Sequence, residues 1–232
     1  MSIILSIETS IPEASVALTI NGQISTQQEF ESHRQQNKLL FPALESVLAK
    51  LPKNKSPDLI IVGTGPGSYS GSRISIAAAQ GLAIAYSCPV VGLCSFLGTH
   101  TMSQHTTAYA IGDARRDTYF IAKIQQNRPE FQPGEPELLS LDDFCKKLST
   151  IDTSLTPLFS FEKELPMLHV ANYIVDKSHA AKLTKVWLEL SSETQQSLLQ
   201  TPPQPAYLRA PFITKAKPGH PLLRKNKSGL NK

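Results

Sequence analysis

Short apolar runs and turns alternate at the start of the chain, a pattern that predicts a small antiparallel sheet. Residues 2–10 form an apolar run that ends in polar residues, as a buried strand does. Apolar side chains then recur at every second position over residues 14–20, and Asn21-Gly22 follows. Asn-Gly between extended runs is a strong hairpin signal, because both residues tolerate positive φ. With residues 23–30 as the returning strand, we expect a three-stranded meander.

An alternation of helix and strand follows the meander. Ser32 and Gln35 have the spacing of a capping box, and a stripe of apolar residues with helical period runs from Leu40 to Leu51. Pro42 lies inside this span, so we expect a kink or a late start to the helix. A buried strand is then predicted over residues 58–62, followed by a Gly-rich turn over residues 63–73. A long Ala-rich helix over residues 72–87 and another apolar strand over residues 88–94 come next.

The second half opens with a pattern like that of the first. Residues 108–124 read as strand, tight polar turn and strand, and each half has a carboxylate at the end of its first strand, Glu8 and Asp113. This weak repeat predicts a duplicated α/β unit, with an N-terminal half over residues 1–104 and a divergent C-terminal half over residues 105–210. The helices predicted in the second half lie near residues 141–148 and 179–190.

Composition limits the classes of protein that the chain can represent. Of its 232 residues, 41% are hydrophobic and 18% are charged, so a buried core is feasible. No apolar run approaches the ~20 residues that cross a bilayer, and the N-terminus lacks the basic segment of a secretory signal. The three cysteines form no C-x-x-C pair, which fits a reducing compartment better than a disulfide scaffold or a zinc site. We expect a soluble, cytoplasmic protein without a membrane partner.

The net charge of +4 comes entirely from a basic C-terminal tail. Residues 211–232 contain six Lys or Arg residues and no acidic residue, so the rest of the chain has 17 basic against 19 acidic residues, a net charge of −2. This Pro-, Gly- and Lys-rich tail cannot bury much apolar surface, and we expect it to be disordered. A solvated terminus is the simpler interpretation, and a weak, salt-sensitive contact with RNA is the alternative.

The Gly-rich segment over residues 63–73 is the most distinctive candidate for chemistry. A strand that ends in glycines and leads into a helix places free backbone N–H groups at a helix N-terminus, which suits an anion. The segment has neither the lysine of a Walker A loop nor the third glycine of the Rossmann fingerprint. Gly65, Gly67 and Ser68 are therefore candidates for an anion or nucleotide loop. A tight turn that lets the helix pack closely is the alternative.

Glu8 and Asp113 would face each other across a cleft if the two halves are related as the repeat suggests. Paired carboxylates at strand ends can hold Mg²⁺ or activate a nucleophile, so weak binding of ATP or ADP with Mg²⁺ is one expectation. In the simpler interpretation each carboxylate caps a turn. The histidines form no metal-binding pair and there is no G-x-S-x-G elbow, so the sequence predicts no catalytic and no metal-ligating residue.

The predicted Ala-rich helix has one nearly flat face. Ala77, Gly81 and Ala85 recur every four residues, so they lie on one side of the helix. The backbone of another helix can approach such a face closely. Packing on the protein's own sheet must use part of this helix, and we expect the remaining surface to form a helix–helix interface with a partner.

Taken together, several of these segments resemble the TsaB (YeaZ) family. The matching stretches are ILSIETS, ASVAL, LIIVGTGPGSYSGSRISIAAAQGLA, PVVGL, AIGDARRDTYFIA and a late PAYLR, within residues 2–124 and 205–210. The resemblance implies an actin-like ATPase fold, as in sugar kinases, chaperone relatives and actin, made of two RNase-H-like halves with mixed sheets flanked by helices. It also implies a subunit of the bacterial machinery that makes threonylcarbamoyladenosine on tRNA.

The same resemblance implies a non-catalytic role beside TsaD, the paralogue that transfers threonylcarbamoyl to the adenosine next to the anticodon. In TsaD a His-x-x-x-His metal motif follows a Val-Gly strand end, and here Ser95 and Thr99 replace the two histidines. The family forms a heterodimer with TsaD through its first two helices. By analogy, the partner surface would comprise Gln36, Leu40, Leu44, Arg73, Ile76, Ala77, Gln80 and Ala83.

Further implied partners are a TsaE-like ATPase, tRNA contacted through the complex, and a second copy of the chain when TsaD is absent. Two departures from the family pattern reduce nucleotide-binding chemistry and favour a scaffold: Glu8 stands where an aspartate is usual, and Gln80 stands where a lysine is usual. Two rival functions stay open, a small-molecule phosphotransferase of the same fold and a glycoprotease-like hydrolase.

Overall fold

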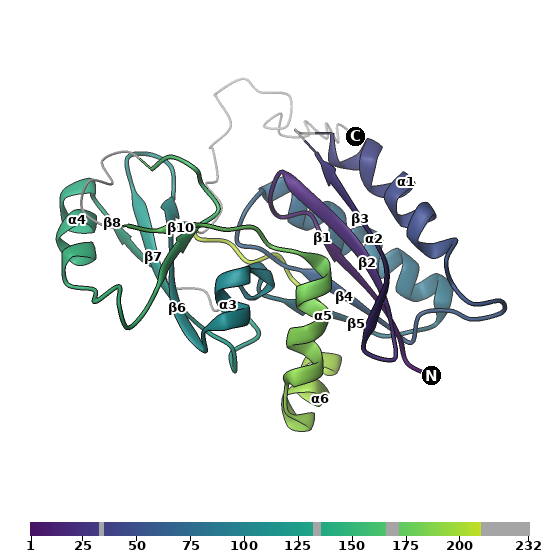
Figure 1. Ribbon diagram of the computed structural model, residues 1–232. Helices are drawn as coiled ribbons and strands as arrows, with labels where there is room; N and C mark the ends of the chain where they lie inside the picture. The colour runs from purple at the N-terminus through teal and green to yellow at the C-terminus, as the bar shows by residue number, and fades with distance from the viewer. Residues whose placement is uncertain (33–34, 132–135, 166–171, 210–232) are drawn as a thin grey trace, which may run out of the picture.

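The computed structural model describes residues 1–32, 35–131, 136–165 and 172–209, which form two lobes. Each lobe is built on a five-stranded sheet, with strand orders β3-β2-β1-β4-β5 and β10-β9-β6-β7-β8 (Figure 1). In each sheet an antiparallel hairpin lies beside parallel strands. This arrangement confirms the predicted α/β class. The predicted tail, 211–232, lies outside the described residues.

The first lobe begins with the predicted meander. Its strands are β1 (Ile3–Glu8), β2 (Glu13–Ile20) and β3 (Gln23–Glu31). Asn21 and Gly22 both have positive φ in the turn between β2 and β3, as a tight hairpin requires. On the other side of β1, β4 (Leu59–Gly63) and β5 (Val90–Leu93) add two parallel strands.

Two helices, α1 (Gln36–Leu48) and α2 (Tyr69–Tyr86), cover one face of the first sheet (Figure 1). Because successive side chains of a strand point to opposite faces, Ile3, Leu5 and Ile7 of β1 all point toward these helices. They share one hydrophobic cluster with residues of both helices, among them Leu40, Leu44, Ile76 and Ala83.

The starts of both helices differ from the predicted ones. Helix α1 begins at Gln36 and continues through Pro42, and Ser32 does not cap it, because the Ser32 hydroxyl donates to the carbonyl of Pro12. Helix α2 begins at Tyr69, before the predicted start at residue 72. Its cap is Ser68, whose Oγ accepts a hydrogen bond from the N–H of Gly71.

The opposite face of the first sheet is covered by two helices from the end of the chain, α5 (Ala180–Glu189) and α6 (Ser192–Gln200). Leu183 and Trp187 of α5 pack with Ile4, Ile61 and other strand residues that point to this face. The predicted boundary at residue 104 separates the two sheets. The predicted half over residues 105–210 is nevertheless not one spatial unit, because its last helices complete the core of the first lobe.

The second lobe is smaller and more irregular. A 3-10 turn, η1 (Ser95–Gly98), and a short helix, α3 (His100–Gln104), lead into the sheet from the first lobe. The hairpin of β6 (Thr107–Asp113) and β7 (Tyr119–Gln125) was predicted. The remaining strands are short: β8 (Glu137–Leu139), β9 (Leu158–Ser160) and β10 (Ile174–Val175).

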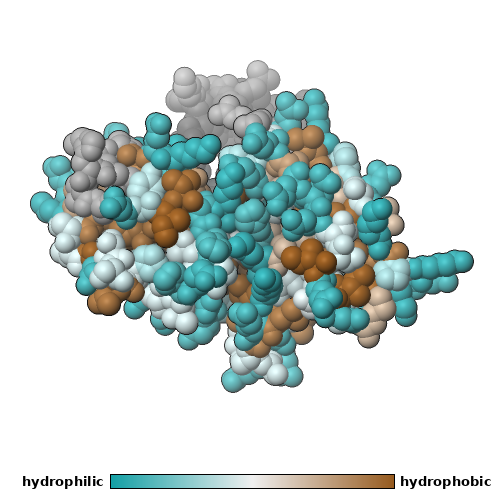
Figure 2. Space-filling view, viewed as in Figure 1, coloured by the Kyte–Doolittle hydropathy of each residue, from teal (hydrophilic) through white to brown (hydrophobic). Residues whose placement is uncertain are grey.

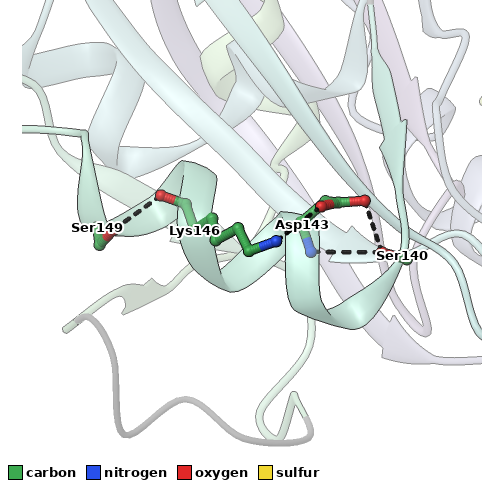
Figure 3. A network of polar contacts seen from close by, with 4 residues as sticks. All are labelled: Ser140, Asp143, Lys146 and Ser149. Atoms are coloured by element: carbon green, nitrogen blue, oxygen red, sulfur yellow. Dashed lines mark hydrogen bonds and ion pairs between the residues drawn. The ribbon is translucent and has the colours of Figure 1, made fainter.

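Helix α4 (Leu141–Ser149) packs on the second sheet through Phe144 and Leu148, as its predicted position implies. Figure 3 shows its polar side. The Oγ of Ser140 accepts a hydrogen bond from the N–H of Asp143 and caps the helix, and Lys146 lies 3.4 Å from the Asp143 carboxylate. The Ser140 hydroxyl and Lys146 together lower the pKa of Asp143. The signals that start this helix are therefore local in the sequence, and its packing on the sheet adds to them.

Within the described ranges, no helix combines the length and the apolarity that crossing a membrane requires. Figure 2 shows the face of the molecule that carries α5. Hydrophilic residues predominate along the middle of this face, and the hydrophobic patches are scattered over both lobes. On this face, the described residues do not gather into one broad apolar surface.

Candidate functional site

The Gly-rich loop between β4 and α2 packs directly against the turn that follows β1. The N–H of Ser68 donates to the carbonyl of Ser10 at 2.6 Å, and the hydroxyl of Thr9 donates to the carbonyl of Gly71 at 2.8 Å. A Cβ on Gly67 would lie 2.2 Å from the Ser10 carbonyl oxygen, and one on Gly71 would lie 2.0 Å from that of Thr9. The glycines therefore permit close backbone packing, and an anion in this loop stays a prediction.

Glu8 and Asp113 occupy matching places in the two halves. Glu8 is completely buried, and its carboxylate accepts hydrogen bonds from the N–H of Ser10 at 2.7 Å and the hydroxyl of Ser178 at 2.9 Å. Asp113 accepts from the N–H of Arg115 at 2.6 Å and pairs with the Arg115 guanidinium at 3.1 Å. Each carboxylate thus accepts a hydrogen bond from the backbone N–H two residues further along the chain and so closes a turn, as the simpler interpretation states.

The geometry fits a magnesium nucleotide poorly. Glu8 points to Ser10 and Ser178, and Asp113 is already paired with Arg115. Across the described part of the chain, no three His, Cys, Asp or Glu side chains come close enough together to hold a metal ion. Gly65, another predicted loop residue, donates its N–H to the Ser95 hydroxyl at 2.9 Å. Several groups that would bind Mg²⁺ and phosphate are therefore used within the protein.

A pocket of about 740 Å³ lies between the lobes. The turn after β1 and the Gly-rich loop form one side, the end of β6 and residues 160–162 form another, and residues 206–209 close it. Of the predicted loop residues, the pocket brings together Gly67, Ser68 and Asp113, whereas Glu8 and Gly65 are not part of its lining.

The charged or polar lining residues that were not predicted from the sequence include Ser10, Glu162 and Arg209. Burial raises the pKa of Glu162, and the nearby charge of Asp113 adds to this, although the N–H of Asp113 donates to its carboxylate at 3.1 Å. Arg209 belongs to the late PAYLR stretch, which the family resemblance had singled out. That stretch was the one signal in the sequence that pointed to a residue of this pocket. Nothing in the local sequence marks Ser10 or Glu162.

The predicted partner surface is divided between the core and the exterior. Leu40, Leu44, Ile76 and Ala83 are buried in the cluster beneath α1 and α2, so these four are core residues and are not accessible to a partner. Arg73 and Ala77 are exposed and Gln80 is half-buried. The side chain of Gln36 lies outside the described residues.

The small-residue face of α2 points away from the protein's own sheet. Ala77, Gly81 and Ala85 are all exposed, and a Cβ on Gly81 would have no heavy atom within 4 Å. Ile84, on the same side of the helix, is 82% exposed, and Phe41 of the neighbouring α1 is 58% exposed. This outer face of α2 therefore combines small side chains with one large, exposed apolar side chain, Ile84.

The two residues that replace histidines have structural roles. Ser95 is buried and its Oγ accepts the hydrogen bond from Gly65. The hydroxyl of Thr99 donates to the carbonyl of Phe96 at 2.7 Å and accepts from the N–H of Met102 at 3.2 Å, which caps α3. Neither position provides a metal ligand of the imidazole type.

The two mixed sheets, their helices and the pocket between the lobes define an α/β protein of the actin-like, RNase H-like type. The TsaD family, described as tRNA N6-adenosine threonylcarbamoyltransferase, matches residues 21–133. Two solved structures from Pseudomonas aeruginosa, "an uncharacterized protein with similarity to peptidase YEAZ" and "YeaZ", are similar with TM-scores of 0.63 and 0.60. Each comparison covers 90% of this chain and 100% of the other, at 23% and 22% identity.

Two proteins named "tRNA threonylcarbamoyladenosine biosynthesis protein TsaB", from Escherichia coli and Haemophilus influenzae, are each 28% identical to this chain over 137 and 138 residues. The matches cover 57% of this chain and 59% and 58% of the relatives, which is less than two thirds of their length. Together, these findings show that the chain is similar to proteins named TsaB and YeaZ and to part of the TsaD family model.

Proposed function

We propose that this protein is a non-catalytic partner subunit in the biosynthesis of tRNA threonylcarbamoyladenosine in the cytoplasm. Its partner would be a TsaD-like paralogue that carries out the transfer, and tRNA would be contacted through the complex. The similarity to proteins named TsaB supports the proposed process. The outer face of α2, exposed and flat, is the observation that carries the role of a partner subunit.

The residues at the positions that hold metal ligands in the catalytic paralogue support this role. The positions that would supply metal ligands in the catalytic paralogue hold Ser95 and Thr99, and both hydroxyls are used to stabilise the backbone. Glu8 is buried and hydrogen-bonded, so it is not available to a substrate. Binding this subunit would instead stabilise the active conformation of the partner.

The outer face of α2 suits a helix from the partner. Two helices can approach closely where small residues lie at the contact, and Ala77, Gly81 and Ala85 supply such a strip. Ile84 would become buried in the complex, and this burial would contribute free energy to binding. The isolated chain has the same face available, so a second copy would compete for it when the partner is absent.

The test is reconstitution of threonylcarbamoyladenosine formation on tRNA from purified components, with this protein present, omitted or replaced by a variant. Ala77→Glu places a charge on the outer face of α2, and we expect loss of both the complex and the modification. Gln196→Glu adds the same charge to an exposed position on α6, on the other side of the sheet, and should behave as wild type.

Two results would count against the proposal. If modification proceeds unchanged when the protein is omitted, the role of partner subunit is wrong. If the protein is required but Ala77→Glu binds as wild type does, the partner docks elsewhere. Ala77 is preferred to Ala78 for this test because Ala78 packs against the core beneath α2.

A further inference from the structure

Helix α2 carries a single charged residue, Arg73, and this residue lies on its outer face. Over Tyr69–Tyr86 the helix contains no aspartate, glutamate or lysine. Arg73 lies four residues before Ala77, so the two side chains are neighbours on the same side of the helix. Arg73 is exposed, as Ala77 and Gly81 are. A helix that docks against the small residues therefore comes close to one positive charge.

Two tyrosines hold the Arg73 side chain in place. The guanidinium lies over the ring of Tyr69, 4.0 Å from its centroid, and the Nε donates a 2.6 Å hydrogen bond to the hydroxyl of Tyr207. The rings of the two tyrosines stack with their centroids 5.4 Å apart. An arginine that is held in this way loses little conformational freedom when a further group binds to it.

The charge of Arg73 has no negative neighbour in the part of the chain that the structure describes. Arg73 belongs to none of the ion pairs found there. The hydrogen bond to Tyr207 raises the pKa of Arg73, and no carboxylate contributes to this shift. The two Nη groups carry four further N–H donors in a planar fork, whose geometry matches the two oxygens of a carboxylate. The side chain is therefore oriented and charged, and its natural counterpart is an acidic residue from outside.

A docked helix would cover part of this arginine, so the residue that it places opposite Arg73 affects binding. A charge that is removed from water without a counter-charge costs free energy, and a carboxylate in a bidentate pair offsets that cost. A second copy of this chain has no acidic residue on its own α2 and brings a second Arg73 to the contact. From α1 it could offer only Glu45.

We infer that Arg73 determines which partner docks on α2: it favours a protein that presents an aspartate or glutamate at its contact helix, and it disfavours a second copy of this chain. The inference rests on the proposed function, because it places the partner on the outer face of α2. In the complex, the partner's carboxylate would accept hydrogen bonds from the guanidinium while Tyr69 and Tyr207 keep the guanidinium in position.

The first test is calorimetric titration of the full-length protein with the purified TsaD-like paralogue. Arg73→Ala should weaken binding about tenfold or more, because it removes a charge-assisted pair. Arg73→Lys should give an intermediate affinity, since lysine keeps the charge but cannot pair in a bidentate way. Tyr207→Phe removes the hydroxyl that accepts from Arg73 and leaves the guanidinium on Tyr69, so it should keep most of the affinity.

The second test measures self-association of the chain alone by analytical ultracentrifugation. Arg73→Ala removes an unpaired charge from the contact between two copies, so we expect it to form dimers several-fold more readily than the wild type does. The same substitution therefore acts in opposite directions in the two tests. Lys185→Ala is the control, because it removes one positive charge from an exposed position of α5, on the other face of the sheet, and should match the wild type in both.

Three results would overturn this inference and leave the proposed function intact. The first is binding of the paralogue to Arg73→Ala as tightly as to the wild type. The second is an equal loss of binding in Arg73→Ala and Tyr207→Phe, because Arg73 would then act only through the C-terminal segment. The third is self-association of Arg73→Ala no stronger than that of the wild type. If the wild type does not bind the paralogue at all, the proposed function fails together with the inference.

Discussion

Arg73 and Tyr207 lie 134 positions apart in the chain, and the Nε of Arg73 donates a 2.6 Å hydrogen bond to the Tyr207 hydroxyl. The Arg73 guanidinium also lies over the ring of Tyr69, 4.0 Å from its centroid, and the rings of Tyr69 and Tyr207 stack at 5.4 Å. Next to Tyr207, the N–H of Ala206 donates to the carbonyl of Thr64 at 2.8 Å. These contacts fasten the C-terminal segment to the first lobe beside the pocket.

Removing the Tyr207 side chain should loosen this segment. In Tyr207→Ala we expect faster hydrogen exchange at the amide of Ala206, because its hydrogen bond to Thr64 would open more often. Tyr173→Ala, which removes an exposed hydrogen bond in the second lobe, serves as the control and should leave this amide unchanged. Equal exchange in Tyr207→Ala and wild type would show that backbone contacts alone hold the segment.

Two glycines of α2 should respond in opposite ways to the same substitution. Gly71→Ala should lower the free energy of unfolding by about 3 kcal/mol, because its Cβ would lie 2.0 Å from the Thr9 carbonyl oxygen. Gly81→Ala should raise it by about 0.5–1 kcal/mol, because alanine favours the helix and nothing lies near its Cβ. Urea unfolding measures both values, and a similar change in the two variants would contradict the described packing of α2.

Asp176 should stabilise the protein in a pH-dependent way. Burial by itself would raise the pKa of Asp176, but hydrogen bonds from Thr101, Lys177 and His100 outweigh it and lower this pKa below its usual 3.8. The stabilisation is therefore complete above the unfolded pKa and is lost as the pH falls through the folded one. Asp176→Asn should cost about 2 kcal/mol at pH 7 and progressively less as the pH falls below the usual pKa of 3.8. Urea unfolding at several pH values tests this, and a pH-independent cost would contradict it.

The effect of Glu162 on stability should change with pH in the opposite direction to that of Asp176. Burial raises the pKa of Glu162 above its usual 4.5, so the stability that its protonated form contributes is complete below that value and is lost as the pH rises through the folded pKa. Glu162→Gln keeps an oxygen that can accept from the N–H of Asp113. We expect the variant and the wild type to have similar thermal midpoints at pH 4 and the variant to be more stable at pH 7. A lower midpoint at pH 7 would show that the charge is stabilised in the pocket.

The elements that the sequence predicted well are those whose signals are local. The hairpin at Asn21-Gly22 and helix α4, with its Ser140 cap, depend on residues that are neighbours in the chain. Helix α6 was missed because most of its residues are polar and Leu198 alone is buried. The short strands β9 and β10 contain two or three residues each, too few for any periodicity.

The candidate site was harder to predict because it depends on contacts between distant segments. Leu40 and Leu44 were expected at the partner surface, but apolar residues at helical spacing mark the side that packs on the sheet. The pairing of Glu8 with Ser178 joins residues 170 positions apart, so no local pattern reveals it. The same holds for Ser10, whose lack of a hydrogen-bond partner becomes visible only when its three-dimensional surroundings are known.

The packing of α5 and α6 on the first sheet has a consequence for how the chain is made. Strands β1, β4 and β5 emerge from the ribosome early, but the residues that cover one of their faces, Leu183, Trp187 and Leu198, emerge nearly last. Until then Ile4, Ile61 and their neighbours have no cover on that side. The nascent chain therefore lacks the cover of this sheet face for most of its synthesis, and apolar surface exposed in this way is prone to aggregate.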